Sequence, residues 1–204
     1  YLDTGAMYRA GALRVAQVGE NPADEAAVAA VAQRLSISFG ALQSDGSQTV
    51  FINEQNATAL IRSPEVSQLT SVISALPAVR REIVHKQRQL GYSAPLGLVA
   101  EGRDTTTVVF PNAHLKVFLT ASEQVRAQRR ADQLYGAGAS TSLTDVLAEQ
   151  RARDRRDSTR ADSPLQAPEG GLIMNTDHLS AEDAARRIEE ALNRALQRRP
   201  DYTA

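Results

Sequence analysis

Three short and almost continuous apolar segments constrain the fold of this chain more than any other sequence feature. They cover residues 97–100, 115–119 and 171–174. Apolar runs of this kind are typical of strands that are buried on both faces of a parallel sheet. Each run is followed, after a turn and a variable gap, by a segment with helical character, at residues 122–135, 142–160 and 180–199. The alternation of strands and helices predicts an α/β fold with a parallel sheet.

The part of the chain before these runs is mostly helical in its pattern, with one change of period. A strand at residues 1–3 leads into a helix over 6–18 that Gly19 ends. A second helix follows to about residue 35, with Pro22 in its first turn. Between 36 and 60 the pattern becomes that of strands, which predicts a small inserted antiparallel sheet. Two more helices and a connection rich in Gly, Ala and Ser are predicted at 63–76, 77–90 and 135–142.

The composition excludes several classes of protein. The chain has no cysteine, so it forms no disulfide and has no thiol nucleophile. Its three histidines, His85, His114 and His178, lack the spacing of a zinc site, and no G-x-S-x-G motif is present. A formal net charge of −1 argues against a nucleic-acid polymer as partner. Without an apolar run of membrane-spanning length or a signal-peptide pattern, we expect a cytoplasmic protein with no membrane partner.

Arginine carries almost all of the positive charge of the chain. Only two of the 23 Lys and Arg residues are lysine, Lys86 and Lys116. The planar guanidinium group is suited to binding phosphate and carboxylate groups. A GC-rich genome would produce the same excess, so composition alone leaves a role in phosphate binding open.

Polar residues that directly follow the predicted strands are the first candidates for a site, because ligands of open α/β sheets bind beyond the carboxyl ends of the strands. Residues 3–9 follow the first strand and begin a helix, whose N-terminus attracts anions. Residues 101–104, Glu-Gly-Arg-Asp, follow another strand and place Arg103 beside Asp104 on a tight turn. A surface ion pair at Arg103 and Asp104, and a solvated helix residue at Arg9, are equally compatible with the pattern.

An arginine-rich stretch near residue 155 has a helical arrangement of charge. Arg153, Arg156, Asp157 and Arg160 stand at positions i, i+3, i+4 and i+7, which is one face of a helix. Three guanidinium groups with one carboxylate are poorly neutralised, which suits an external polyphosphate. A solvated helix with internal ion pairs is the simpler interpretation of this stretch when it is taken alone.

Three motifs resemble those of the bacterial cytidylate kinase family. They are residues 2–9 (LDTGAMYR), residues 101–104 (EGRD) leading to 108–111 (VVFP), and residues 153–157 (RDRRD) with Arg160. The resemblance runs through essentially the whole chain in order and spacing, and it includes the inserted sheet. This family transfers the γ-phosphoryl group of ATP to CMP or dCMP.

The resemblance implies a P-loop nucleoside-monophosphate kinase fold, with a three-layer parallel sheet, an inserted small antiparallel sheet and a lid. The core α/β domain would comprise residues 1–33, 92–121 and 161–204, the monophosphate-binding region 34–91, and the lid 122–160. ATP and CMP or dCMP are the implied partners. Mg²⁺ is implied as a cofactor that is bound with ATP, with no metal ligands assigned in the chain, and we expect a monomer.

The resemblance also implies roles for individual residues. Arg9 and Arg103 would hold the CMP phosphate, and Ser71, Arg80 and Asp104 would read the cytosine base. Cytosine offers an amino donor that a carboxylate accepts, whereas uracil has a carbonyl there, so Asp104 suits this role on chemical grounds as well. The remaining expected substrate residues are Thr4, Tyr8, Arg153, Asp157 and Arg160. The expected catalytic residues are Arg126, Arg130 and Arg153, of which Arg126 and Arg130 would face the ATP phosphates when the lid closes.

The sequence departs from the family at two places. Thr105, Thr106 and Thr107 replace the usual Met-Gly-Thr, and a positive φ at Thr106 would be strained. The P-loop motif G-x-x-x-x-G-K-[ST], which in the family immediately precedes the LDTG motif, is absent. We therefore expect an N-terminally truncated chain that binds ATP poorly and catalyses little by itself. The alternatives are a non-catalytic CMP-binding module and a kinase for another monophosphate such as UMP.

Overall fold

The computed structural model of the chain describes residues 1–44, 46–136, 138 and 141–198. The chain folds as two compact units, Tyr1–Thr105 and Thr106–Ala204. The predicted α/β class is confirmed, because both parallel and antiparallel sheets occur together with helices.

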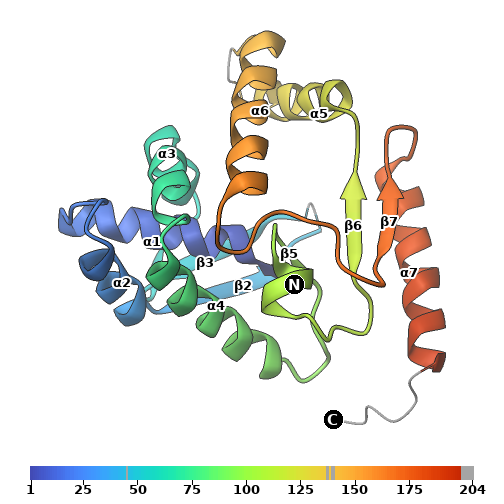
Figure 1. Cartoon of the computed structure of the whole chain (residues 1–204), viewed down its shortest axis with the longest axis horizontal. Helices are drawn as coiled ribbons and strands as arrows, with labels where there is room; N and C mark the ends of the chain where they lie inside the picture. The colour runs from blue at the N-terminus through green and yellow to red at the C-terminus, as the bar shows by residue number, and fades with distance from the viewer. Residues whose placement is uncertain (45, 137, 139–140, 199–204) are drawn as a thin grey trace. The chain divides into compact units, whose positions relative to one another are not determined.

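Helix α1 (Thr4–Val18) is the central helix of the first unit (Figure 1). It packs against helices α2 (Glu25–Arg34), α3 (Pro64–Ile73) and α4 (Pro77–Tyr92), and against the short 3-10 helix η1 (Leu60–Arg62). The Asp3 carboxylate caps its N-terminus by accepting a hydrogen bond from the Ala6 amide at 2.8 Å. Gly19 ends it in a left-handed conformation with φ of 72°, as the sequence predicts.

The predicted place of Pro22 in the second helix is wrong. Helix α2 begins at Glu25, after Pro22, because the Asp24 side chain caps it by accepting from the Ala27 amide at 3.0 Å. An aspartate cap satisfies an otherwise unpaired backbone donor, so it determines the first residue of the helix more strongly than a proline upstream of it. Ser63 caps α3 in the same way.

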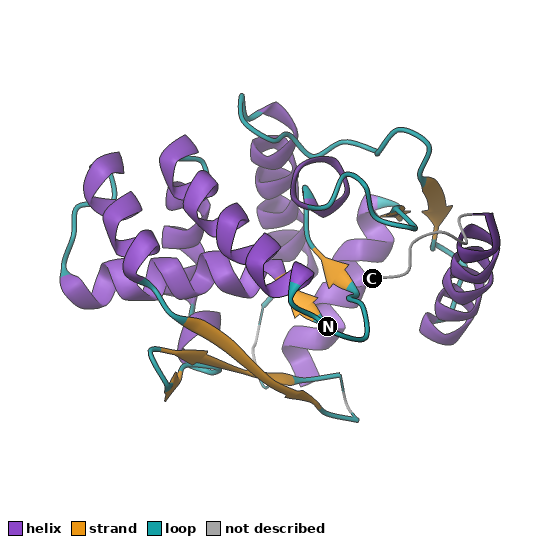
Figure 2. Ribbon diagram, turned by 90° about the horizontal axis from the view of Figure 1, so that it is seen from below, coloured by secondary structure: helices purple, strands orange, loops and turns teal. Residues whose placement is uncertain are grey.

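The inserted antiparallel sheet is confirmed. It has the order β2 (Ile37–Leu42), β3 (Gln48–Ile52) and β4 (Gln55–Asn56). Val50 and Ile52 alternate along β3 and are buried, at 2% and 5% exposure. Figure 2 shows this twisted sheet with the helices of the same unit on one side of it.

The first unit also contains a short parallel pair of strands that lies at the start of α1. Strand β1 (Leu2–Asp3) pairs with β5 (Ala100–Glu101), with Leu2 opposite Ala100 and Asp3 opposite Glu101. The chain then forms a π-helical turn, η2 (Thr105–Val109). Thr106 is not among the described non-glycine residues with positive φ, so the strain considered for it does not arise.

The second unit contains another parallel pair and three helices. Strand β6 (Val117–Thr120) pairs with β7 (Leu172–Asn175) along four residues. Helices α5 (Glu123–Gly136) and α6 (Leu143–Thr159) pack against each other through Ala127, Ala131 and Val146. Helix α7 (Ala181–Arg198) follows β7. Part of the predicted connection at 135–142 lies outside the described residues.

The prediction that the apolar runs are strands buried on both faces is wrong for this structure. Val99, Leu119 and Ile173 are 69%, 55% and 60% exposed. Among the described residues, each parallel ladder has only two strands, and a pair of strands has too few neighbours to cover both of its faces. The parallel strands therefore form two separate pairs, β1 with β5 and β6 with β7.

Within the described ranges, no helix combines the length and the hydrophobicity that crossing a lipid bilayer requires.

The β3–β4 turn contains a strained residue that can be tested. Asn53 and Glu54 have φ angles of 47° and 69°, which is the backbone of a tight hairpin turn that favours Gly at its second position. Glu54→Gly relieves the left-handed strain, so we expect it to raise the free energy of unfolding by about 0.5–1 kcal/mol in a urea titration. Glu54→Ala removes the same side chain but keeps the Cβ atom. Equal stability of the two variants would contradict this explanation.

Candidate functional site

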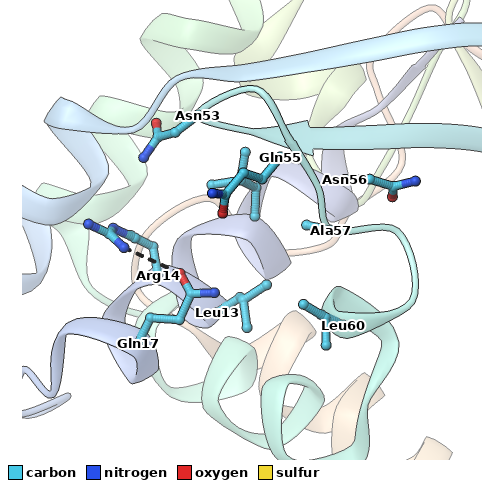
Figure 3. A pocket seen from close by; sticks show the side chains of 9 residues that line it. Leu13, Arg14, Gln17, Asn53, Gln55, Asn56, Ala57 and Leu60 are labelled. Atoms are coloured by element: carbon cyan, nitrogen blue, oxygen red, sulfur yellow. Dashed lines mark hydrogen bonds between the residues drawn. The ribbon is translucent and has the colours of Figure 1, made fainter.

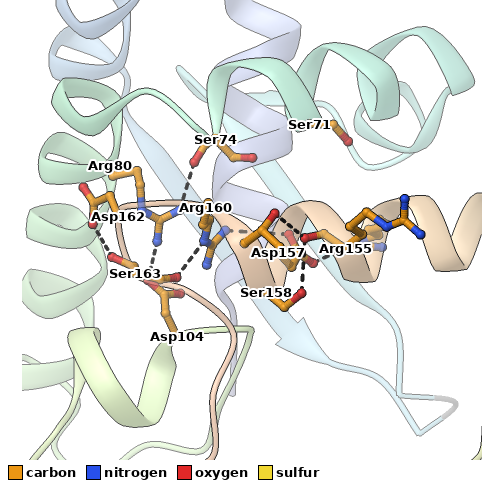
Figure 4. Close-up of polar contacts among 12 residues, drawn as sticks. Ser71, Ser74, Arg80, Asp104, Arg155, Asp157, Ser158, Arg160, Asp162 and Ser163 are labelled. Atoms are coloured by element: carbon orange, nitrogen blue, oxygen red, sulfur yellow. Dashed lines mark hydrogen bonds and ion pairs between the residues drawn. The ribbon is translucent and has the colours of Figure 1, made fainter.

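A buried ion pair joins Arg80 of α4 to Asp104, which follows β5. Both residues are 3% exposed. One guanidinium nitrogen of Arg80 contacts the Asp104 carboxylate, and the other terminal nitrogen donates to the Ser74 carbonyl at 3.0 Å (Figure 4). The same guanidinium group lies 5.3 Å from the centre of the Tyr8 ring, on α1. Arg80 therefore ties α1, α4 and the turn after β5 together.

Arg9 lies one residue after Tyr8 and contacts a different helix. Its guanidinium group donates to the Ser67 hydroxyl of α3 at 3.1 Å. Ser71 stands one turn later on α3, and its hydroxyl donates to the Ser67 carbonyl at 3.4 Å. Arg9 and Ser71, which the sequence assigns to the phosphate and the base of one nucleotide, thus share Ser67 as a neighbour. The role of Ser67 was missed because a serine in a helix carries no distinguishing pattern.

The start of α1 and the turn after β5 are held together at Thr4. Its hydroxyl donates to the Glu101 carbonyl at 2.6 Å, and Thr4 itself is 2% exposed. The fully buried Gln87 of α4 donates from its side-chain amide to the Thr4 carbonyl at 3.4 Å. The half-buried Arg103 follows on the same turn, between Gly102 and Asp104.

Negative charge gathers beside this junction. Burial, and then the nearby charges of Glu101 and Asp3, raise the pKa of Tyr1 to about 12.

In the second unit, Asp157 lies between two of the predicted arginines. Its carboxylate oxygens are 3.8 Å from the Arg153 Nε and 3.7 Å from an Arg160 terminal nitrogen. The sequence predicts that Arg160 lies on one helical face with Asp157. Helix α6 instead ends at Thr159, so Arg160 lies one residue beyond the helix and has extended backbone. The Arg160 side chain turns towards the Ser163 carbonyl, to which it donates at 2.6 Å (Figure 4).

The two predicted arginines of α5 differ in their surroundings. Arg126 contacts Asp154 of α6 at 2.5 Å, and a second ion pair joins Arg151 to Glu123 at 2.8 Å. Arg130 is exposed and donates to Gln133 on its own helix at 2.7 Å. Arg126 thus helps to hold α5 against α6, while Arg130 presents its charge on the surface.

Arg129 is an anchoring residue that sequence reasoning missed. Its guanidinium group donates to the Thr176 carbonyl at 2.5 Å and to the Thr176 hydroxyl at 3.0 Å. The Thr176 hydroxyl in turn donates to the Thr120 carbonyl at 3.0 Å. These bonds fasten α5 to the carboxyl ends of β6 and β7. The sequence offers no signal that separates Arg129 from its neighbouring arginines.

A shallow pocket of the first unit lies at the end of α1 that is remote from Thr4. Its volume of about 50 Å³ is room for a few water molecules only (Figure 3). None of the predicted site residues lines it; the lining residues are Leu13, Arg14, Gln17, Ile52, Asn53, Gln55, Asn56, Ala57 and Leu60.

No metal ligand set emerges from the part of the chain that the structure describes. Within it, no three His, Cys, Asp or Glu residues group in a way that could hold a metal ion.

Asp177 follows β7 and contacts Ser122, which precedes α5, and the dependence of stability on pH can test this contact. The Ser122 amide donates to its carboxylate at 2.7 Å, and this hydrogen bond is the main cause that lowers the pKa of Asp177 from its usual 3.8. The stabilisation is therefore complete above pH 3.8 and is lost as the pH falls through the lower folded-state value.

We expect Asp177→Asn to make thermal unfolding of the protein less sensitive to acid than that of the wild type below about pH 4. Glu189→Gln, which alters an exposed carboxylate of α7, serves as the control. Identical acid profiles of wild type and Asp177→Asn would contradict the assignment.

The Arg80–Asp104 pair can be tested by breaking it from either side. Arg80→Met or Asp104→Ala leaves one buried charge without its partner, which costs about 3–5 kcal/mol of unfolding free energy. The double variant removes both charges, so it should cost clearly less than the two single variants added together. Urea unfolding of all four proteins measures this coupling, and strict additivity would show that the pair is not coupled.

Comparison with known proteins identifies the family of this chain. The sequence profile described as Cytidylate kinase matches residues 1–194. A cytidylate kinase of Pasteurella multocida is 42% identical over 182 residues, which are 89% of this chain and 78% of that protein. A cytidylate kinase of Saccharophagus degradans is 41% identical over 188 residues, 92% of this chain and 82% of that protein. A bifunctional pantoate ligase/cytidylate kinase of Synechococcus elongatus is 46% identical over 185 residues, 89% of this chain and 35% of that protein. The chain belongs to the cytidylate kinase family.

Proposed function

We propose that this chain phosphorylates CMP and dCMP, with ATP as the phosphoryl donor, and that the nucleotide acceptor binds beside the Arg80–Asp104 pair. The observation that carries the proposal is the buried carboxylate of Asp104, which Arg80 holds in one orientation. Family membership makes the chain a kinase, and the geometry of the first unit supports CMP as its substrate.

The chemistry of the base explains why a carboxylate at this place favours cytosine. An ionised carboxylate only accepts hydrogen bonds. The exocyclic amino group of cytosine donates one, whereas the carbonyl at the same position of uracil would face the carboxylate as a second acceptor. A buried acceptor that is left without a donor is costly, so the site should reject UMP. Arg80, Asp104 and Ser71 are the proposed base-reading residues.

Arg9 and Arg103 are the proposed phosphate-binding residues. Arg9 belongs to α1, near the helix N-terminus, where unpaired amide groups and the helix dipole attract anions. Arg103 lies on the turn that Thr4 holds against α1. Both guanidinium groups can form two parallel hydrogen bonds to a phosphate. Thr4 and Tyr8 complete the proposed CMP-binding residues of the first unit.

The second unit supplies the remaining proposed residues. Arg153 and Asp157 would meet the ribose, and Arg160 would complete the nucleotide site. Arg126, Arg130 and Arg153 would stabilise the charge that develops on the transferred phosphoryl group, which is the main requirement of this reaction. Mg²⁺ would arrive on the ATP phosphates and neutralise their charge; the described residues offer no ligand cluster of their own for it.

The proposal extends to the organisation of the protein. We assign residues 1–33, 92–121 and 161–204 to a P-loop-type three-layer core, 34–91 to the monophosphate-binding region and 122–160 to a lid. The chain would act as a cytoplasmic monomer on free nucleotides. Size-exclusion chromatography with light scattering tests the monomer.

Asp104→Asn tests the base-reading role. The asparagine keeps the shape of the side chain but also presents a donor, so we expect the preference for CMP over UMP to fall by about 10- to 100-fold. Calorimetry measures the dissociation constants of both nucleotides. Turnover is measured with ATP and Mg²⁺ on the chain alone and with a family P-loop segment joined before Tyr1.

Asp24→Asn is the matched control, because asparagine caps a helix as well as aspartate and Asp24 lies outside the proposed site. An unchanged CMP preference in Asp104→Asn would remove Asp104 from base recognition. Tight CMP binding without turnover in either form would favour a CMP-binding module, and a preference for UMP would favour the other kinase activity.

A further inference from the structure

Gly102 occupies a position where no side chain fits. A Cβ atom added to it would lie 2.1 Å from the Thr4 hydroxyl oxygen and 3.0 Å from the Thr105 Cγ2 atom. The first distance is far shorter than any non-bonded contact, so one of the two residues would have to move. Gly102 is not one of the described glycines with a positive φ. The glycine is therefore required by the lack of room for a side chain and not by the backbone conformation.

Thr4 has little freedom to move away from such a side chain. It is 2% exposed, and its hydroxyl proton is used in the 2.6 Å hydrogen bond to the Glu101 carbonyl. Gln87 holds the Thr4 carbonyl from the other side. Rotation of the Thr4 side chain, or separation of the two backbones, would break the bond to Glu101.

The contact between Thr4 and Gly102 joins the two segments that carry the proposed CMP-binding groups. Thr4 is the first residue of α1, which bears Tyr8 and Arg9. Gly102 immediately precedes Arg103 and Asp104. The distance between the two backbones at this contact therefore sets the spacing between Arg9 on one side and Arg103 and Asp104 on the other.

We infer that Thr4 and Gly102 are a positioning pair that sets the affinity for CMP, and that Thr4 acts through the Glu101 carbonyl. This inference rests on the proposed function. Because Gly102 has no side chain, the Thr4 hydroxyl can reach the Glu101 carbonyl. The resulting close approach of the two segments positions the guanidinium groups of Arg9 and Arg103 and the carboxylate of Asp104 around one nucleotide. Misplacement of such groups by about 1 Å is enough to weaken binding or catalysis strongly.

Gly102→Ala is the first test, with CMP binding to the full chain measured by calorimetry. We expect the dissociation constant for CMP to rise by about 10-fold or more, because Arg103 and Asp104 are pushed away from α1. Gly11→Ala is the matched control: it adds the same methyl group to α1, where it meets Ile73 Cδ1 at an ordinary 3.6 Å, and should leave the affinity unchanged.

The double variant separates positioning from a loss of stability. Thr4→Ala weakens CMP binding by itself, but it also removes the oxygen that the new methyl group would strike. Adding Gly102→Ala to Thr4→Ala should therefore cost much less affinity than Gly102→Ala costs alone. Thermal unfolding of each variant is recorded in parallel, and binding is measured well below each unfolding temperature.

The outcomes are distinct. If Gly102→Ala unfolds earlier but binds CMP with wild-type affinity, Gly102 has only a structural role and the inference is overturned. If the Gly102→Ala effect is the same with and without the Thr4 hydroxyl, the pair is not the cause and the inference is again overturned. Failure of the wild-type chain to bind CMP would instead contradict the proposed function.

Discussion

The ion pair between Arg80 and Asp104 brings two charges into the interior of the first unit, where groups from other parts of the chain compensate for their lost hydration. Burial of a charge is costly unless it is paired and hydrogen-bonded. Arg80 meets that demand with the Asp104 carboxylate, the Ser74 carbonyl and the face of the Tyr8 ring. These partners come from three parts of the chain, so the pair forms only when α1, α4 and the turn after β5 have assembled. The same requirement leaves a carboxylate held in one orientation, which is the property that base recognition needs.

The second unit uses its arginines differently. Asp157 and Arg160 are only 16% and 13% accessible, whereas the Arg151 and Glu123 side chains form an exposed pair, at 55% and 45%. Pairs of this kind contribute about 0–1 kcal/mol each. Arg129 is the exception, because it is bound to the backbone at Thr176 and holds α5 to the strands.

The local signals of the sequence were sufficient for most of the secondary structure. Side-chain caps and apolar spacing are short-range, so helix α1 with its Gly19 end, the α3 start at Ser63 and the antiparallel sheet were predicted close to their observed bounds. The burial of the parallel strands was not predicted correctly, because it depends on how many strands lie side by side. Val99, Leu119 and Ile173 show that an apolar run alone does not specify what covers it.

By itself, the sequence determined the helical and strand segments, the family and the residue types of the candidate site, since these depend on local spacing and on motifs. Only the tertiary structure decided which of those residues share partners: Arg9 with Ser67, Arg80 with Asp104 and Tyr8, and Thr4 with Glu101. It also assigned roles to Gln87, Gly102 and Arg129, whose importance lies in a close approach or a buried hydrogen bond. Such contacts join residues far apart in the chain, and their geometry exists only once the elements have packed.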